Sequence, residues 1–290
     1  MSPVLVNIGC GSVWHPDWIN LDVRPHSPSV QTWDVGNGLP FEKGQVDVCY
    51  ASHVLEHFTQ EKAKRLLLEC HRVLCPGGII RLAVPDLEGI VREYLRVLAR
   101  AEAGEPRATE EYEWITLELL DQLVRDTSGG EMERYLRTQA RNNTEYVIGR
   151  IGVGAMTYME PGRHSSLSSE SNRCGDLSIM SKIVRTIRSL VPELKGCLVN
   201  GDHEALRIGR FRLSGECHQW MYDRFSLGQL ITQCGFSDAQ VCHAHDSRIG
   251  QFASFGLEVT DGKVRKPDSL FMEAIKPAGK YLDRSAHTPC

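Results

Sequence analysis

Short apolar runs alternate with polar and amphipathic stretches over the first hundred residues. This alternation is typical of strands and helices arranged around a parallel β-sheet. The apolar runs predict strands over residues 4–8, 19–23, 30–33, 46–51 and 79–84. Apolar residues recur at helical spacing over 60–74, and Pro76-Gly77-Gly78 ends that helix.

The pattern changes after Pro85. A helix is expected over 86–100, with Asp86 in position to be its N-cap. Helical stretches with few strand signals then follow, at 113–125, 131–141 and 178–190. The alternation resumes with a helix at 226–234 and strands at 239–243 and 269–275.

This order of elements predicts one α/β domain with an insertion. The core is expected from residues 1–100 and 216–277, and a mostly helical insertion, 101–215, follows the fifth strand. Residues 278–290 are expected to be a tail.

Composition and charge exclude several classes of protein. The 290 residues are 41% hydrophobic and 24% charged, as in a folded globular chain. The net charge is −4, so no overall positive field favours nucleic acid or an anionic membrane as a partner. The chain has no run of about 18 apolar residues and no signal-peptide pattern at its start. We therefore expect a cytoplasmic protein that binds neither nucleic acid nor membrane.

The ten cysteines stand singly in the sequence, without a CxxC pair. This spacing argues against a zinc ribbon and against a disulfide scaffold. Most are expected to be buried small hydrophobic residues, with Cys10 and Cys290 as candidate exceptions.

Residues suited to ligand binding follow the predicted strands. Ligands of open α/β sheets bind beyond the carboxyl ends of the strands. The first strand ends in Gly9-Cys10-Gly11, and the second ends with Asp22. Glycines let the backbone approach a ligand, and a carboxylate at the second strand can accept hydrogen bonds from ribose hydroxyls. Later strand ends supply further polar residues: Asp34, Ser52, His53, His57 and Asp86.

The spacing of the glycine turn disfavours a dinucleotide. A dinucleotide fingerprint requires a third glycine where this chain has Trp14, and an acid about 20 residues further on. Asp22 follows Gly9 by only 13 positions. A nucleoside without a pyrophosphate fits this spacing better.

Several motifs together resemble class I S-adenosylmethionine-dependent methyltransferases. They are Val6-Asn7-Ile8-Gly9-Cys10-Gly11, Asn20-Leu21-Asp22, Asp34 and Ala51-Ser52-His53-Val54-Leu55-Glu56-His57. The run Arg72-Val73-Leu74-Cys75-Pro76-Gly77-Gly78 is similar to the branch called methyltransferase type 11. The resemblance implies a Rossmann-like sheet of seven strands. It also implies that the last strand, 269–275, is antiparallel to its neighbours.

The resemblance also implies a site for S-adenosyl-L-methionine. Gly9 and Gly11 would lie against its methionine part. Asp22 would bind the ribose, and Asp34 would lie near the adenine amino group. Adjoining residues would complete the site: Cys10, Val23, Val35, Ser52 and His53. The chain departs from the pattern at Asn7, where many relatives have an acidic side chain, and no cofactor contact is assigned there.

Histidines are the candidate catalytic residues. A hydroxyl acceptor must lose its proton, and imidazole is the side chain suited to accept it near neutral pH. His57 follows His53 by one helical turn, and His218 lies where the insertion rejoins the core, which makes it the leading base candidate. The alternative for each ring is a structural hydrogen bond. No carboxylate cluster for an oxygen-preferring cation is visible, so no metal site is expected. Asp86 could be a ligand or a base as well as an N-cap.

The insertion is the expected source of acceptor specificity. The apolar face of 113–124 suits packing on the core or on a second copy in a homodimer. Arginines around it could be solvated or could bind an anionic group of the acceptor: Arg134, Arg137, Arg141, Arg150 and Arg163. The resemblance implies methyl transfer to a small molecule or glycan-type acceptor, most simply at oxygen. A subunit that binds the cofactor without catalysis, or a nitrogen, sulfur or carboxylate acceptor, remains open.

Overall fold

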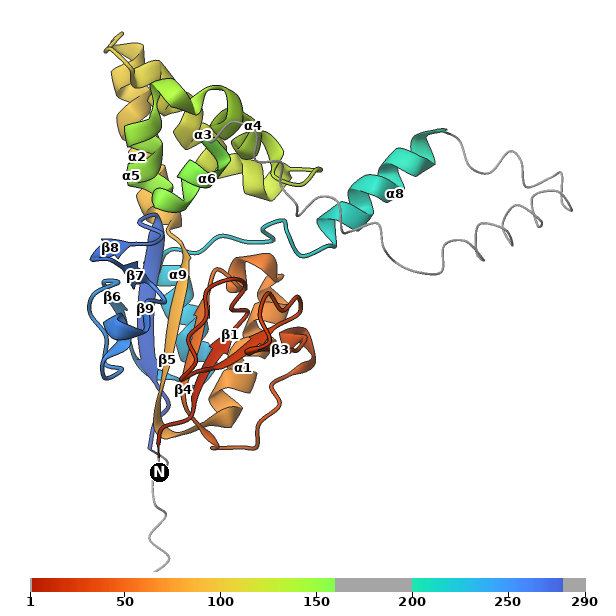
Figure 1. Cartoon of the computed structure of the whole chain (residues 1–290), viewed down its shortest axis with the longest axis vertical. Helices are drawn as coiled ribbons and strands as arrows, with labels where there is room; N and C mark the ends of the chain where they lie inside the picture. Colours follow the sequence, from red (N-terminus) through yellow and green to blue (C-terminus); the bar gives the residue numbers. More distant parts are fainter. Residues whose placement is uncertain (1, 160–199, 279–290) are drawn as a thin grey trace, which may run out of the picture.

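The computed structural model describes residues 2–159 and 200–278, so the predicted helix 178–190 lies outside the described residues. Seven strands form one sheet in the order β3-β2-β1-β4-β5-β9-β6 (Figure 1). They are β1 Leu5–Ile8, β2 Ile19–Asp22, β3 Val30–Thr32, β4 Val46–Ser52, β5 Leu74–Pro85, β6 Ser237–Cys242 and β9 Ser269–Ile275. The strands from β3 to β5 are parallel, and β9 is antiparallel to both β5 and β6. The predicted seven-stranded sheet and its antiparallel last strand are confirmed.

Two helices cover one face of this sheet. They are α1 Gln60–Val73 and α9 Arg224–Gln233, whose buried residues pack on β1 and β4 in the main apolar cluster. Each helix begins at a side-chain cap. Thr59 accepts a hydrogen bond from the Lys62 amide, and Asp223 forms a capping box with Ser226. These caps fix where each helix starts and therefore which residues face the sheet.

The opposite face has no helix between β1 and β2, or between β2 and β3. It is covered instead by Trp18 and by the short 3-10 helix η6, Phe252–Phe255, which precedes the small hairpin of β7 Val259–Thr260 and β8 Lys263–Val264. Trp18, Tyr50 and Phe252 pack edge to face, with centroids 5.4–6.1 Å apart. A carboxyl-terminal segment therefore covers this part of the sheet, where helices are absent.

A buried ion pair attaches that segment to the sheet. Arg81 of β5 is fully buried, and its guanidinium lies 2.5 Å from a Glu258 oxygen and 2.6 Å from a Glu273 oxygen. It also donates to the backbone carbonyls of His243 and Asp246. Such complete pairing is required because an unpaired buried charge is costly.

Further helices follow β5 in the chain; α2 to α6 lie above the sheet in Figure 1, and α8 lies apart from them to the right. They are α2 Leu87–Glu102, α3 Ala108–Val124, α4 Gly130–Thr138, α5 Thr144–Ile151, α6 Met156–Met159 and α8 Asn200–Arg212, with the short η3 Ala140–Asn142 and η4 Val153–Ala155. Trp114, Tyr135 and Val147 belong to a separate apolar cluster there. The predicted helical insertion after the fifth strand is confirmed.

Two general expectations can be compared with the described residues. No helix in 2–159 or 200–278 is long and apolar enough to cross a membrane. All seven cysteines in these ranges are free thiols, and five of them, including Cys10, are buried. Cys290 lies outside the described residues.

Candidate functional site

The turn after β1 has the backbone that glycine permits. Gly9 and Gly11 have φ values of +64° and +53°, which other residues rarely adopt. A Cβ at Gly9 would lie 2.6 Å from a methyl of Val54, so no side chain fits there. A Cβ at Gly11 would meet no atom within 4 Å. The turn therefore packs against the protein at Gly9 and faces open space at Gly11.

Asp22 joins the end of β2 to this turn. One carboxylate oxygen accepts a hydrogen bond of 2.8 Å from the Gly11 amide, and the other accepts one of 2.8 Å from the Arg24 amide. A carboxylate has about four acceptor sites. Two of them therefore remain for hydroxyl groups of a ligand.

Asp34 begins the 3-10 helix η1, Val35–Asn37. Its oxygens accept hydrogen bonds from the Gly36 amide and from the Asn37 side chain, at 2.9 and 3.0 Å. Asp34 is exposed, whereas Val35 is partly buried against the main core. The pair thus presents a fixed carboxylate beside an apolar side chain.

Asn7, the departure from the family pattern, has a structural role. It is buried, and its amide donates to the Val13 carbonyl and to the side chain of Asn20. Asn20 in turn donates to the carbonyls of His15 and Trp18. The two amides hold the loop 9–18, which has no helix to fix it.

The remaining predicted cofactor residues lie near these groups in the sequence but differ in exposure. Cys10 is buried, and burial, with the nearby Asp22 charge, raises the pKa of its thiol to about 11. Val23 is exposed, and Ser52 is partly buried at the end of β4. A protonated Cys10 thiol is a packing group and not a nucleophile.

His53 is held in an uncommon conformation just beyond β4. Its φ is +54°, and its amide donates to the Ala83 carbonyl at 2.8 Å. Its ring nitrogens lie 2.9 Å from the Ser269 hydroxyl and 3.1 Å from Glu56 Oε1. Strained residues persist only where several contacts determine them. His53 is therefore a rigid link between β4, β9 and Glu56.

Glu56 lies at the centre of a cluster that includes both predicted catalytic histidines. It belongs to the 3-10 helix η2, Leu55–His57, and is completely buried. The rings of His57 and His218 meet edge to face, with centroids 4.9 Å apart. Neither Glu56 oxygen nor Nδ1 of His57 has a hydrogen bond of regular geometry. Glu56 Oε2 and His57 Nδ1 are therefore electron-pair donors without a partner at the strand ends, and Glu56 Oε1 contacts only His53.

The segment that rejoins the core brings His218 to η2. The Gln219 and Trp220 amides both donate to the Glu56 carbonyl, at 2.6 and 3.3 Å. The His218 amide donates to Gln122 of α3, and Tyr222 accepts from the Leu87 amide. The segment is thus fixed between the sheet and the insertion.

Burial determines the charge states of this cluster. It lowers the pKa of His57, and it lowers that of His218 to about 3. Burial alone would raise the pKa of Glu56, but the neighbouring His53, with smaller effects of the other rings, holds it at about 2. Near neutral pH the cluster therefore contains two neutral imidazoles and one carboxylate.

Asp86 occupies the N-cap position of α2, as predicted, although its side chain makes no capping hydrogen bond. Its carboxylate lies near Gly89 in the first turn, and burial raises its pKa. Three of the arginines considered for an anionic acceptor group are paired with acids, and one of these, Arg150, pairs with Glu118. Arg134 pairs with Glu131, and Arg137 with Glu133. Arg163 lies outside the described residues.

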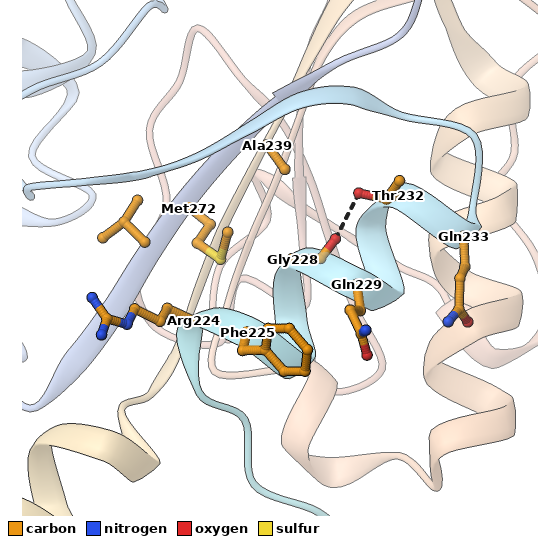
Figure 2. A pocket seen from close by; sticks show the side chains of 9 residues that line it. Arg224, Phe225, Gly228, Gln229, Thr232, Gln233, Ala239 and Met272 are labelled. Atoms are coloured by element: carbon orange, nitrogen blue, oxygen red, sulfur yellow. Dashed lines mark hydrogen bonds between the residues drawn. The ribbon is translucent and has the colours of Figure 1, made fainter.

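A cavity of about 690 Å³ lies elsewhere, between α9 and the strands β6 and β9 (Figure 2). Arg224 and Phe225 lie at one end of the view and Gln233 at the other, with Met272 opposite the helix. Its lining contains no residue of the glycine turn or of the histidine cluster. It is a surface groove and not the predicted site.

The sequence predicted the histidines of the cluster but missed Glu56. The signal was present, because a charged residue stands between Leu55 and His57, inside the quoted motif. Its importance depends on burial and on the approach of His218, which is 162 positions away along the chain. The periodicity of apolar residues shows neither the burial of Glu56 nor the approach of His218.

The family comparison agrees with the motifs. The model of the methyltransferase domain family matches residues 6–82, which span β1 to β5 and include the glycine turn, Asp22 and the histidine-bearing η2. No curated protein matches the chain. The match confirms the resemblance drawn from the motifs, and with it S-adenosylmethionine as the cofactor.

Three similar solved structures illustrate the likeness. One is the complex of the Haloferax volcanii Trm112 methyltransferase activator with a protein assigned as a methyltransferase, at 10% identity, TM-score 0.37, covering 95% of this chain and 83% of that one. The CurJ carbon methyltransferase has 12% identity and TM-score 0.36, with 95% and 49% covered. Phosphoethanolamine N-methyltransferase 1 of Haemonchus contortus has 15% identity and TM-score 0.24, with 30% and 24% covered. The chain thus spans less than half of the last two.

Proposed function

We propose that this chain, an S-adenosylmethionine-dependent methyltransferase with its family domain at residues 6–82, methylates a hydroxyl oxygen of a small-molecule, sugar or natural-product acceptor. The observation that supports oxygen is the contact between His57, which is partly buried, and His218, which is buried, at the strand ends. A hydroxyl must lose its proton to become a good nucleophile, and a positioned base contributes about 10²- to 10⁴-fold to such a step. A thiol or amine acceptor would need less help.

We propose that the cofactor binds at the strand ends, at the residues assigned to it from the sequence. Open space at Gly11 and two free acceptor sites on Asp22 suit an adenosyl group with ribose hydroxyls. When bound, S-adenosylmethionine supplies a methyl group already activated by a positively charged sulfur. We assign the following residues to hold it: Gly9, Cys10, Gly11, Asp22, Val23, Asp34, Val35, Ser52 and His53.

His57 is the better base of the two histidines. Its Nδ1 is buried and has no hydrogen-bond partner, so in the tautomer with the proton on Nε2 it can accept a proton. A base with a pKa near 3, as burial gives His218, accepts a proton poorly at neutral pH. The sequence favoured His218 for this role. We now assign proton acceptance to His57. The ring of His218 packs against the ring of His57.

We propose that residues 101–215 act as the acceptor-binding part, and that the core comprises 1–100 and 216–277. The supporting observation is the position of α2 to α6 beyond the carboxyl end of β5 (Figure 1). Binding elements placed there can hold an acceptor in line with the methyl group. Such alignment can contribute about 7–11 kcal/mol to lowering a barrier.

Turnover with a panel of acceptors tests this function. The purified chain is supplied with S-adenosylmethionine and with hydroxyl, thiol and amine compounds or cell extract, and S-adenosylhomocysteine and methylated products are measured. We expect methylated hydroxyls, and a fall in kcat for His57→Ala with cofactor affinity retained. Methylation of thiols or amines alone would overturn oxygen as the target. No S-adenosylhomocysteine with any acceptor would instead support a subunit that binds the cofactor without catalysis.

A further inference from the structure

We propose that Glu56, His57 and His218 form a binding site for a divalent transition-metal ion, with open coordination positions for the acceptor oxygen. The role of this site in the reaction rests on the proposed function. The existence of the site rests on the arrangement of the three side chains.

The three side chains converge closely enough to share one ion. One ligand atom from each lies within 4.8 Å of the others. Ligands of a common ion, bound at about 2.1 Å, are about 3.0–3.5 Å apart in tetrahedral or adjacent octahedral positions. Small side-chain rotations would close this difference. Within the described residues this is the one group of histidine, cysteine and acidic side chains with such convergence.

A second observation points independently to a cation. Glu56 is 0% exposed, yet its Oε2 has no partner and its Oε1 contacts only the His53 ring. Nδ1 of His57 is also buried without a partner. Buried ionised carboxylates are normally paired or bound to metals, because the unpaired charge is costly. The contact of His53 with Glu56 Oε1 at 3.1 Å leaves Glu56 Oε2 unpaired.

The donor set indicates the class of ion. Two imidazoles and one carboxylate suit Zn²⁺, Mn²⁺, Fe²⁺ or Co²⁺, whereas Mg²⁺ and Ca²⁺ prefer oxygen ligands alone. Three protein ligands leave at least one position for a water or a substrate oxygen, as in catalytic zinc sites.

Hydrogen bonds from neighbouring residues hold the proposed ligands in place, as they commonly do in metal sites. The backbone of Glu56 accepts the two amides of Gln219 and Trp220, which ties His218 to η2. These contacts hold the backbone of Glu56 beside the segment that carries His218 before an ion binds.

The ion changes one part of the proposed reaction. A hydroxyl oxygen bound to a divalent transition metal loses its proton more readily, as zinc-bound water does with a pKa of about 7. With the ion bound, the acceptor proton would leave to solvent while His57 holds the ion; without an ion, His57 accepts the proton itself. The same residues would thus serve the same acceptor oxygen by a different route.

Metal binding is tested on the full chain after removal of metals with a chelator. Co²⁺ is added, and its visible absorption and bound metal content are measured. We expect one Co²⁺ per chain with the absorption of a four- or five-coordinate ion, displaced by Zn²⁺. Glu56→Gln and His57→Ala should each lose this signal, whereas His245→Ala, an exposed histidine, should keep it. Circular dichroism shows whether each variant is folded.

Three results would overturn the site. They are no Co²⁺ binding by the wild-type chain, an unchanged Co²⁺ spectrum in folded Glu56→Gln, or a sulfur-to-cobalt charge-transfer band that assigns the ion to cysteines. Turnover separates this inference from the proposed function. Hydroxyl methylation that persists in chelator, without metal binding, would refute the site alone. Metal binding without hydroxyl methylation would refute the proposed function alone.

Discussion

The Gly11 amide donates a hydrogen bond of 2.8 Å to Asp22, so the turn after β1 and the acid that ends β2 are directly joined. The same carboxylate also accepts from the Arg24 amide. It is therefore oriented before any ligand arrives. Because an oriented group loses little further freedom on binding, its hydrogen bonds to ribose hydroxyls would contribute efficiently to affinity.

Asp22→Ala is expected to weaken S-adenosylhomocysteine binding at least about tenfold. The change removes charged hydrogen bonds that contribute about 1.5–3 kcal/mol, and it also frees the Gly11 turn. Isothermal titration calorimetry gives the Kd. Asp17→Ala, an exposed acid in the adjoining loop, should leave the Kd unchanged. Equal affinities of Asp22→Ala and the wild type would disprove the assigned ribose contact.

Asn7→Asp is expected to destabilise the protein by about 1–3 kcal/mol. A carboxylate cannot donate to the Val13 carbonyl or to Asn20, and at this buried position it would face their oxygens. Chemical denaturation monitored by circular dichroism measures the free energy of unfolding. The matched control is Asn142→Asp, at an exposed position, which should change it little. If both variants are equally stable, the amide network does not hold the loop.

The apolar pattern was sufficient to predict where the strands of the sheet lie in the sequence, whereas the antiparallel direction of the last strand was implied by the family resemblance. The residues 19–23 and 269–275 alternate or cluster as buried strands require, and their observed bounds, Ile19–Asp22 and Ser269–Ile275, differ by one residue at most. The fifth strand was predicted at 79–84 but extends over Leu74–Pro85. Pro76 and the two glycines that follow lie in the first half of this strand. They were interpreted as the end of a helix, because such residues usually mark turns.

The cover of the second sheet face and the full site could not be predicted from local pattern. Phe252 reaches Trp18 across more than 230 positions of sequence. Likewise, Glu56 is informative only because it is buried beside His218. Such contacts depend on tertiary packing, whereas periodicity reports only which face of a strand or helix is apolar.

Gly9→Ala and Gly11→Ala are expected to differ in their effects. Both substitutions place alanine at a positive φ, which costs about 1 kcal/mol. Only the Cβ at Gly9 meets Val54, at 2.6 Å, so Gly9→Ala should lower the melting temperature more. Gly11→Ala should mainly weaken cofactor binding, because its Cβ enters the open space. Thermal denaturation and calorimetry on both variants measure the two effects. A Gly11→Ala protein with normal affinity would show that the cofactor does not approach this turn.

Arg81→Met is expected to lower the free energy of unfolding by about 3–5 kcal/mol. The methionine fills much of the same volume but leaves Glu258 and Glu273 buried without their cation. The residues 243–258 should then detach from the sheet more readily, because they are held to β5 through this guanidinium. Denaturant unfolding measures the loss, and hydrogen exchange locates it. Arg92→Met removes an exposed ion pair with Glu88 and should cost less than about 1 kcal/mol. Equal losses in the two variants would mean that the buried pair contributes no more than a surface pair.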